Sequence, residues 1–326
     1  MRPFTFQKPV TVSQAIAAKK DRTSFLAGGT NLVDLMKKHI ADPDRILDIN
    51  AAVPDKIQST MGGIRIGAMV RNSAAAGNDL VLSQYPLVSK ALLAGASPQI
   101  RNMASMGGNL LQRTRCPYFY DTSLPCNKRK PGSGCGAAKG ESRMAAIVGY
   151  NDLCVAVHPS DLCIALAALD AKVVVTGKDN KETSIAFKDF HKLPGVNPDK
   201  DNNLPVNALV TAIDIPANRF AKNCSYVKLR DRESYAFALV SVAAALQLDG
   251  NRIVEARLAS GGVAHKPWRW YEAEKFLKGK AATVANFSQA AEICAKETRP
   301  LAGNGFKVPM LKGVIETALQ NCLTTQ

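Results

Sequence analysis

The sequence has no apolar run of about 18 residues, which excludes a membrane-spanning helix. Its first twenty residues lack the basic-then-apolar order of a signal peptide, so the start of the chain by itself favours a cytoplasmic protein. The densest basic segment, CNKRK at residues 126–130, contains no aromatic residue on which a base could stack. The net charge of +15 therefore indicates a solvated or partner-facing surface rather than nucleic-acid binding.

Several motifs of hydrolytic and nucleotide-binding proteins are also missing. The four histidines, His39, His158, His191 and His265, show no metal-ligand spacing, and neither HExxH nor GxSxG occurs. The glycine-containing segment at residues 25–32 matches neither GxGxxG nor GxxxxGK[ST]. The sequence therefore predicts no hydrolase, and we expect His158 to be a hydrogen-bonded structural residue.

The pattern that is present is that of a globular α/β chain with two domains. The chain has 326 residues, 46% of them hydrophobic, which is more than one domain with a single core ordinarily contains. The periodicities predict helices over 11–19, from about 31, over 85–97 and 160–169, and strands over 44–50, 62–70, 171–177 and 207–216. From residue 224 they predict long strands with a turn at Asp249–Gly250, then two helices over 268–279 and 284–297. We place the domain boundary near residue 217.

Two segments pair adjacent glycines with polar side chains. FLAGGTNL, at residues 25–32, runs from a strand through Gly28 and Gly29 into a helix, and ASMGGNLL, at residues 104–111, repeats the theme. Adjacent glycines let backbone N–H groups approach a phosphate, and a helix start adds partial positive charge there. A plain turn would look similar, but two such segments in one chain favour a ligand with two phosphates.

The eight cysteines are unevenly distributed. Cys224, Cys294 and Cys322 lie among apolar residues and are typical of buried thiols, as is Cys163 within a predicted helix. The remaining four, Cys116, Cys126, Cys135 and Cys154, begin in a loop rich in Pro, Gly and positive charge that has no core of its own. They form no CxxC pair, yet four thiolates converging on one metal centre would order such a loop. Iron–sulfur and zinc are both candidates, and we expect Lys128, Arg129 and Lys130 to offset the thiolate charge.

Five motifs in order resemble the flavin-binding subunits of the molybdenum hydroxylases, the group of xanthine dehydrogenase, carbon monoxide dehydrogenase and aldehyde oxidoreductases. They are AGGTNL, SMGGNL, HPSDLCIAL, YVKLRDRESYAFALVSVAAAL and GGVAHKPWR. The cysteine loop resembles the flavin subunit of bacterial periplasmic aldehyde oxidoreductases, which carries an additional 4Fe-4S cluster. The resemblance implies an α+β fold: a two-subdomain, PCMH-type FAD-binding region over residues 1–217, with an iron–sulfur insertion at about 113–157, and a smaller C-terminal α/β domain over 218–326.

The same resemblance implies which residues hold the cofactors. For FAD they are Ser24, Phe25, Leu26, Ala27, Gly28, Gly29, Thr30, Asn31 and Leu32 in a pyrophosphate loop, Ser105, Gly108 and Asn109 in a second loop, Asp161, and Lys228 near the flavin ring. For the 4Fe-4S cluster they are Cys116, Cys126, Cys135 and Cys154. No residue is expected to act as an acid or base on the substrate. Because Asn109 precedes Cys116 by only seven residues, we expect the cluster loop beside the flavin site.

The implied function is electron transfer within an aldehyde oxidoreductase heterotrimer. A large molybdenum-cofactor subunit would oxidise the aldehyde, a small 2Fe-2S subunit would pass electrons to FAD, and an external acceptor would receive them. The alternatives are the flavin subunit of 4-hydroxybenzoyl-CoA reductase or xanthine dehydrogenase and, from another class, a zinc-stabilised binding scaffold. The resemblance favours the periplasm, with the export signal on a partner subunit, over the cytoplasm.

Overall fold

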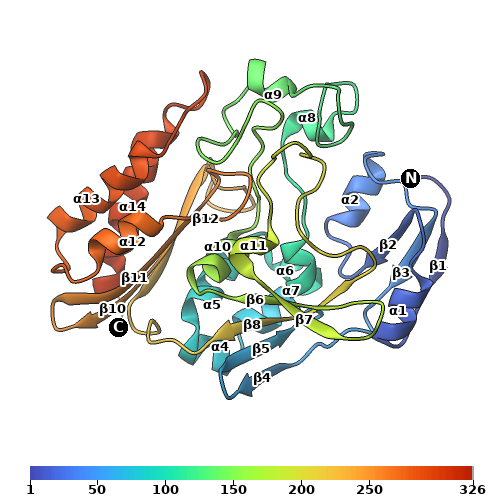
Figure 1. Ribbon diagram of the computed structural model, residues 1–326, viewed down its shortest axis with the longest axis horizontal. Coiled ribbons are helices and arrows are strands. Elements are labelled where there is room, and N and C mark those ends of the chain that lie inside the picture. The colour runs from blue at the N-terminus through green and yellow to red at the C-terminus, as the bar shows by residue number, and fades with distance from the viewer. Residues whose placement is uncertain (325–326) are drawn as a thin grey trace.

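The computed structural model describes residues 1–324, which form three sheets and the helices that cover them (Figure 1). The predicted α+β class is confirmed. The first sheet is parallel and has the order β1 (Thr5–Gln7), β3 (Arg45–Asp48), β2 (Thr23–Leu26). Two helices accompany it, α1 (Val12–Ala18) and α2 (Leu32–Lys37). Thr11 begins α1 as predicted, because its hydroxyl accepts the backbone N–H of Gln14.

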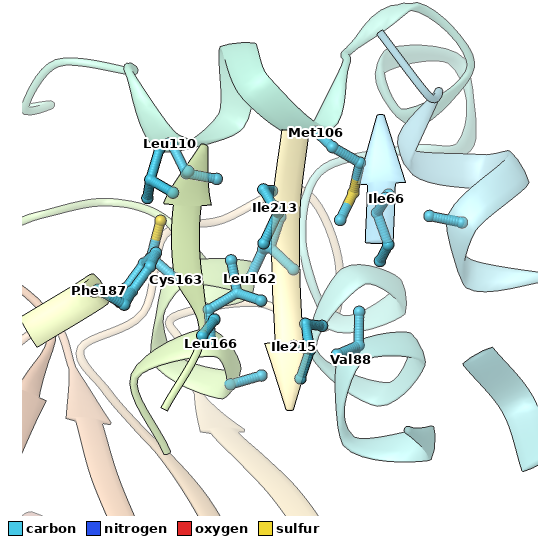
Figure 2. Packing of buried hydrophobic residues seen from close by; sticks show 14 of the residues in the cluster. Ile66, Val88, Met106, Leu110, Leu162, Cys163, Leu166, Phe187, Ile213 and Ile215 are labelled. Atoms are coloured by element: carbon cyan, nitrogen blue, oxygen red, sulfur yellow. The ribbon is translucent and has the colours of Figure 1, made fainter. Parts of the chain in front are cut away.

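The second sheet is antiparallel and forms the centre of the N-terminal region. Its order is β4 (Ile57–Thr60), β5 (Gly63–Gly67), β8 (Leu209–Pro216), β6 (Lys172–Thr176), β7 (Glu182–Ala186). The helices of this region are α3 (Asn72–Ala76), α4 (Asp79–Gln84), α5 (Pro86–Ala94), α6 (Pro98–Met103), α7 (Met106–Leu110), α10 (Asp161–Ala168) and α11 (Phe187–Phe190). Ile66 and Ile213 pack against Met106 and Leu162 in the core beneath the sheet (Figure 2).

The second glycine segment lies in helix α7, so it is not the plain turn that was the alternative to a phosphate-binding segment. Ser105 caps this helix by accepting the N–H of Gly108 at 3.2 Å. Helix α10 agrees with expectation: Ser160 caps it by accepting the N–H of Cys163 at 3.1 Å. Cys163 itself is fully buried in the core, as predicted.

The third sheet belongs to the C-terminal region. Its order is β12 (Trp268–Arg269), β11 (Arg252–Gly261), β10 (Val240–Asp249), β9 (Cys224–Leu229), and β10 and β11 pair as a hairpin. The helices α12 (Tyr271–Leu277), α13 (Val284–Lys296) and α14 (Lys307–Thr324) pack with it around the fully buried Trp270. The two helices predicted over 268–279 and 284–297 correspond to α12 and α13. Helix α14 was not predicted, although buried apolar residues recur in it at helical spacing from Leu311 to Cys322.

Residues 111–160 connect α7 to α10 and contain no strand. Two single-turn helices, α8 (Pro117–Tyr120) and α9 (Gly136–Lys139), interrupt this segment, which projects at the top of Figure 1 in green. Helix α14 contacts the later half of this segment, because the buried amine of Lys307 donates to the carbonyl oxygen of Ala145 at 3.0 Å and to that of Gly262 at 2.8 Å. Among the helices of residues 1–324, none has the length and apolar character to cross a membrane.

Candidate functional site

A cavity of about 1280 Å³ lies where the two N-terminal sheets, the 111–160 segment and the third sheet meet. Its volume exceeds the roughly 300–1,000 Å³ of common small-ligand sites, which suits an extended cofactor. Of the residues predicted to contact FAD, all except Leu26 line it: Ser24, Phe25, Ala27, Gly28, Gly29, Thr30, Asn31, Leu32, Ser105, Gly108, Asn109, Asp161 and Lys228.

The loop between β2 and α2 offers hydrogen-bond donors to this cavity. Within residues 1–324, the backbone N–H groups of Gly28, Gly29, Thr30 and Asn31 donate to no protein acceptor. The side-chain Nδ2 of Asn31 is also buried without a partner, while its Oδ1 accepts the backbone N–H of Arg113 at 3.0 Å. Buried donors are rarely left unpaired, so this loop is suited to binding the oxygen atoms of an anionic ligand.

Glycine at these positions also permits close packing. A Cβ at Gly28 would lie 1.8 Å from the carbonyl oxygen of Met103, just before the second glycine segment. In that second segment the N–H of Gly107 already donates to Ala68 at 2.8 Å and the N–H of Gly108 to Ser105, so these donors have partners. The two glycine pairs therefore differ: the first pair leaves its N–H groups free, and the second brings α7 against β5 and its following turn.

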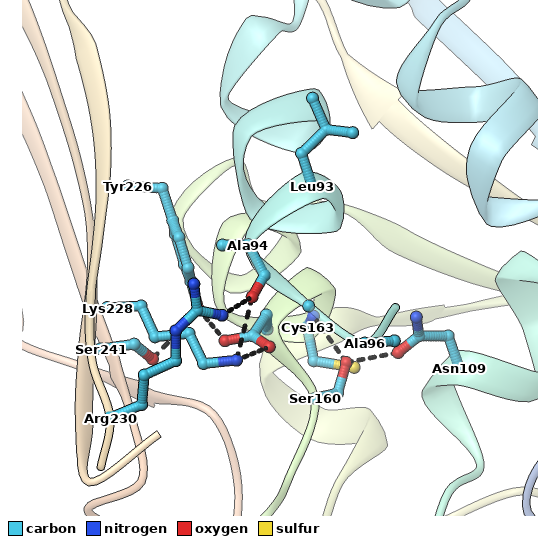
Figure 3. Close-up of polar contacts among 12 residues, drawn as sticks. Leu93, Ala94, Ala96, Asn109, Ser160, Cys163, Tyr226, Lys228, Arg230 and Ser241 are labelled. Atoms are coloured by element: carbon cyan, nitrogen blue, oxygen red, sulfur yellow. Dashed lines mark hydrogen bonds and ion pairs between the residues drawn. The ribbon is translucent and has the colours of Figure 1, made fainter. Parts of the chain in front are cut away.

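A buried polar network lies where β9 and the start of α10 line the cavity (Figure 3). Lys228, on β9, pairs with Asp161, at the start of α10, with 2.8 Å between Nζ and Oδ2 and side chains only 4% and 10% exposed. Tyr226 donates its hydroxyl to the other carboxylate oxygen at 2.7 Å, and Lys228 also donates to the carbonyl oxygen of Ala94 at 3.1 Å. Burial, and then the charge of Asp161, raise the pKa of Tyr226 well above its usual value, so Tyr226 stays a donor.

A second, smaller cavity is lined by all four cysteines of the predicted cluster, Cys116, Cys126, Cys135 and Cys154. None of them forms a disulfide. Cys116, together with Thr114 and Ala156, lines both cavities, so the two share a wall. Burial raises the pKa of the Cys154 thiol to about 12, against an opposing effect of the charge on Lys128. The Cys154 thiol is therefore protonated in the absence of a metal, and a bound metal would displace that proton.

Of the three basic residues at 128–130, only Lys128 lines the cysteine cavity. Its side chain is 2% exposed and its amine forms an ion pair with Asp201. Arg129 instead donates to the carbonyl oxygens of Tyr118 and Phe119 at 2.6 and 2.8 Å, and Lys130 is exposed. The expectation that all three residues offset the thiolate charge is therefore corrected: of the three, Lys128 alone lies at the cysteine cavity.

Three of the four histidines, His158, His191 and His265, are buried. Within residues 1–324, His158, Cys163 and His191 are the one group of at least three potential metal ligands with ligand atoms all within 4.8 Å. Each histidine bonds a backbone group: His158 Nδ1 accepts from Ser160, His191 Nε2 donates to Leu110, and His265 Nδ1 donates to Lys192. Burial lowers the pKa of His191 and His265 to about 4, so both rings are neutral. The expected structural role of His158 agrees with this geometry.

Sequence reasoning missed several residues of the site, above all Arg113, Arg115, Asp201 and Tyr226. Arg113 and Arg115 line the larger cavity, and the guanidinium group of Arg115 lies 5.2 Å from the centre of the Phe237 ring. The run RTR beside the first cysteine was visible as a signal, but nothing in the local sequence points to Asp201, 88 residues beyond Arg113.

Comparison with known proteins defines the class. The FAD binding domain in molybdopterin dehydrogenase matches residues 2–218, and the CO dehydrogenase flavoprotein C-terminal domain matches residues 225–320. The chain therefore belongs to the FAD-binding subunits of the molybdenum hydroxylase family, which are parts of oxidoreductases.

Individual relatives narrow the resemblance. The chain is 46% identical over 322 residues to the aldehyde oxidoreductase FAD-binding subunit PaoB of Escherichia coli strain K12, covering 98% of both chains. It is 30% identical to the glyceraldehyde dehydrogenase medium chain of Sulfolobus acidocaldarius, over 85% of this chain and 82% of that one. The fold matches CO dehydrogenase of Oligotropha carboxidovorans with a TM-score of 0.77 at 22% identity, covering 100% of both chains.

Proposed function

We propose that this chain is the FAD-binding and 4Fe-4S subunit of a molybdenum-containing aldehyde oxidoreductase. The observation that carries the proposal is the pair of adjoining cavities, one lined by the glycine loop and one by four free cysteines, with Cys116 in both walls. When bound, FAD would exchange one or two electrons and the cluster one, which links single-electron centres to a two-electron acceptor.

The assignment of FAD contacts rests on the donors and charges that line the larger cavity. We assign the pyrophosphate to the free N–H groups of Gly28 to Asn31, because four unpaired donors suit phosphate oxygens. We assign the flavin ring to the wall at Lys228, whose buried positive charge would stabilise a reduced, negatively charged ring. Asp161 holds that amine in place and therefore acts on the flavin through Lys228.

The spacing of the cysteines supports an iron–sulfur cluster over zinc. Four thiolates bound to one Zn²⁺ at about 2.3 Å would have their sulfur atoms about 3.8 Å apart. Within residues 1–324, no three of the four cysteine sulfur atoms lie within 4.8 Å of one another, although all four line one cavity. A cluster holds each thiolate on a different iron and suits the wider spacing.

The names of the relatives support the proposed partners and substrate class. The aldehyde oxidoreductase and glyceraldehyde dehydrogenase names support an aldehyde substrate, and "medium chain" implies a larger and a smaller companion. We propose a heterotrimer in which a large subunit holds the molybdenum cofactor and a small subunit holds 2Fe-2S centres. Electrons would reach this chain from the small subunit and leave to an external acceptor.

Analysis of iron and acid-labile sulfide tests the cluster. We expect the purified complex to hold about four iron and four sulfide per chain beyond those of the 2Fe-2S centres in the small subunit. Cys126→Ser should lose this excess and retain FAD and the 2Fe-2S iron. Cys224→Ser is the matched control, because Cys224 is also buried but lines neither cavity. Zinc at one atom per chain, or full iron and sulfide in Cys126→Ser, would contradict the proposal.

We also propose that the complex works in the periplasm, carried there by a partner subunit that bears the export signal. This rests on the resemblance of the cysteine loop to that of periplasmic aldehyde oxidoreductases. Fractionation of cells that express all the subunits tests it: activity confined to the cytoplasm would overturn it.

A further inference from the structure

An ionic bridge spans the wall between the two cavities. Asp201 lies in the segment between α11 and β8 and lines neither cavity itself. One carboxylate oxygen pairs with the amine of Lys128, and the other accepts from Nε of Arg113 at 2.7 Å. Lys128 lines the cysteine cavity, and Arg113 lines the larger one. A single acid thus contacts one cation at each site.

The two cations are held so that they cannot easily separate. Arg113 donates to the carbonyl oxygens of Lys128 at 3.3 Å and Asp199 at 3.1 Å, and Lys128 donates to that of Pro198 at 2.9 Å. The guanidinium group also stacks 4.8 Å from the centre of the Phe119 ring, which lines the cysteine cavity. These contacts tie the chain on both sides of Cys126 to the segment that carries Asp201.

The bridge also reaches the glycine loop. The backbone N–H of Arg113 donates to Oδ1 of Asn31, and the remaining donor of that side chain, Nδ2, is buried without a partner. Arg113 therefore contacts Asp201 through its side chain and orients the Asn31 amide towards the larger cavity through its backbone N–H. The described contacts connect the two cavities through Lys128, Asp201, Arg113 and Asn31.

We infer that Asp201 is a positioning residue that couples the cluster and the flavin electrostatically, with Lys128 and Arg113 acting on the two centres; this inference rests on the proposed function. Two cations and one anion leave one net positive charge in the wall. A buried positive charge stabilises the form of a redox centre that carries the additional electron, and so raises its potential. Because Asp201 neutralises both cations in part, it lowers the potentials of both centres together.

Redox titration of the whole complex tests this coupling. The flavin is followed by its visible absorption and the reduced cluster by electron paramagnetic resonance. We expect Asp201→Asn to shift both midpoint potentials upward. Lys128→Met should lower mainly the cluster potential, and Arg113→Gln mainly the flavin potential. The matched control is Asp214→Asn, which removes an ion pair of 2.7 Å to Arg65 that lines neither cavity, and it should shift neither centre.

The outcomes separate the inference from the function on which it rests. A wild-type complex with no iron and sulfide beyond those of the 2Fe-2S centres would overturn the proposed function and the coupling together. A wild-type complex with its cluster, in which Asp201→Asn shifts one centre or neither, would overturn the coupling alone. If Asp201→Asn loses its cofactors, the other two variants decide. If Lys128 and Arg113 had only a structural role, neither variant would selectively lower the potential of one centre. Absence of this selective lowering would overturn the inference.

Discussion

Asp161→Ala should destabilise the protein strongly, because it leaves the amine of Lys228 buried without its counter-ion. At 2.8 Å and an effective dielectric constant of about 20, the gross attraction of the pair is about 6 kcal/mol. The variant keeps the bond from Lys228 to the carbonyl oxygen of Ala94, so the loss is smaller than the gross value. Removing one member of a buried pair costs about 3–5 kcal/mol, and we expect a loss in that range.

Urea unfolding of the chain without FAD, followed by circular dichroism, measures this loss without a contribution from altered FAD binding. The matched control is Asp231→Ala, which breaks a pair of similar length, 2.7 Å to Arg143, with side chains 49% and 56% exposed. An exposed pair contributes about 0–1 kcal/mol, so this control should change little. The double variant Asp161→Leu with Lys228→Met should be more stable than Asp161→Ala, because no unpaired charge remains. Equal losses in Asp161→Ala and Asp231→Ala would refute the reasoning.

Two other predictions concern the glycine loop and the buried lysine of α14. Gly28→Ala should abolish FAD retention, because its Cβ would lie 1.8 Å from the Met103 carbonyl oxygen. Gly62→Ala has open space around its Cβ and should retain FAD. Flavin absorbance after gel filtration measures both variants, and a yellow Gly28→Ala protein would contradict the assignment. Burial lowers the pKa of Lys307 to about 7 from 10.5, so between these values the unfolded chain binds the additional proton and stability rises with pH. From pH 7 to 10.5 the wild type should therefore gain stability relative to Lys307→Met, by at most about 1.4 kcal/mol per pH unit. Urea unfolding at several pH values measures the difference in unfolding free energy between the two proteins. A difference that does not change with pH would contradict this prediction.

Elements with local signals were predictable from the sequence. Thr11 and Ser160 cap α1 and α10 where expected, because a hydroxyl before an apolar helical repeat has few alternatives. The turn at Asp249–Gly250 joins β10 and β11 as predicted, because Gly250 adopts a φ of +55° that glycine tolerates without strain. The helical second glycine segment was missed, because packing against Ala68 overrides the low helix propensity of glycine.

The sequence by itself determined the chemistry that the protein has available. Two glycine pairs, four clustered cysteines and the basic residues around them are properties of local composition, and the order of the motifs indicated the family. These local features do not predict which side chains face one another, because contacts between residues far apart in the sequence depend on the packing of the whole chain.

Only the tertiary structure decided how these groups are used. It left the N–H groups of one glycine pair free and gave those of the other pair partners, and it buried Lys128 while leaving Lys130 exposed. It brought Asp201 between Lys128 and Arg113, and it made Cys116 part of both cavity walls. The physical reason is that burial and pairing set the energy of a charge, and both arise only when distant segments pack together.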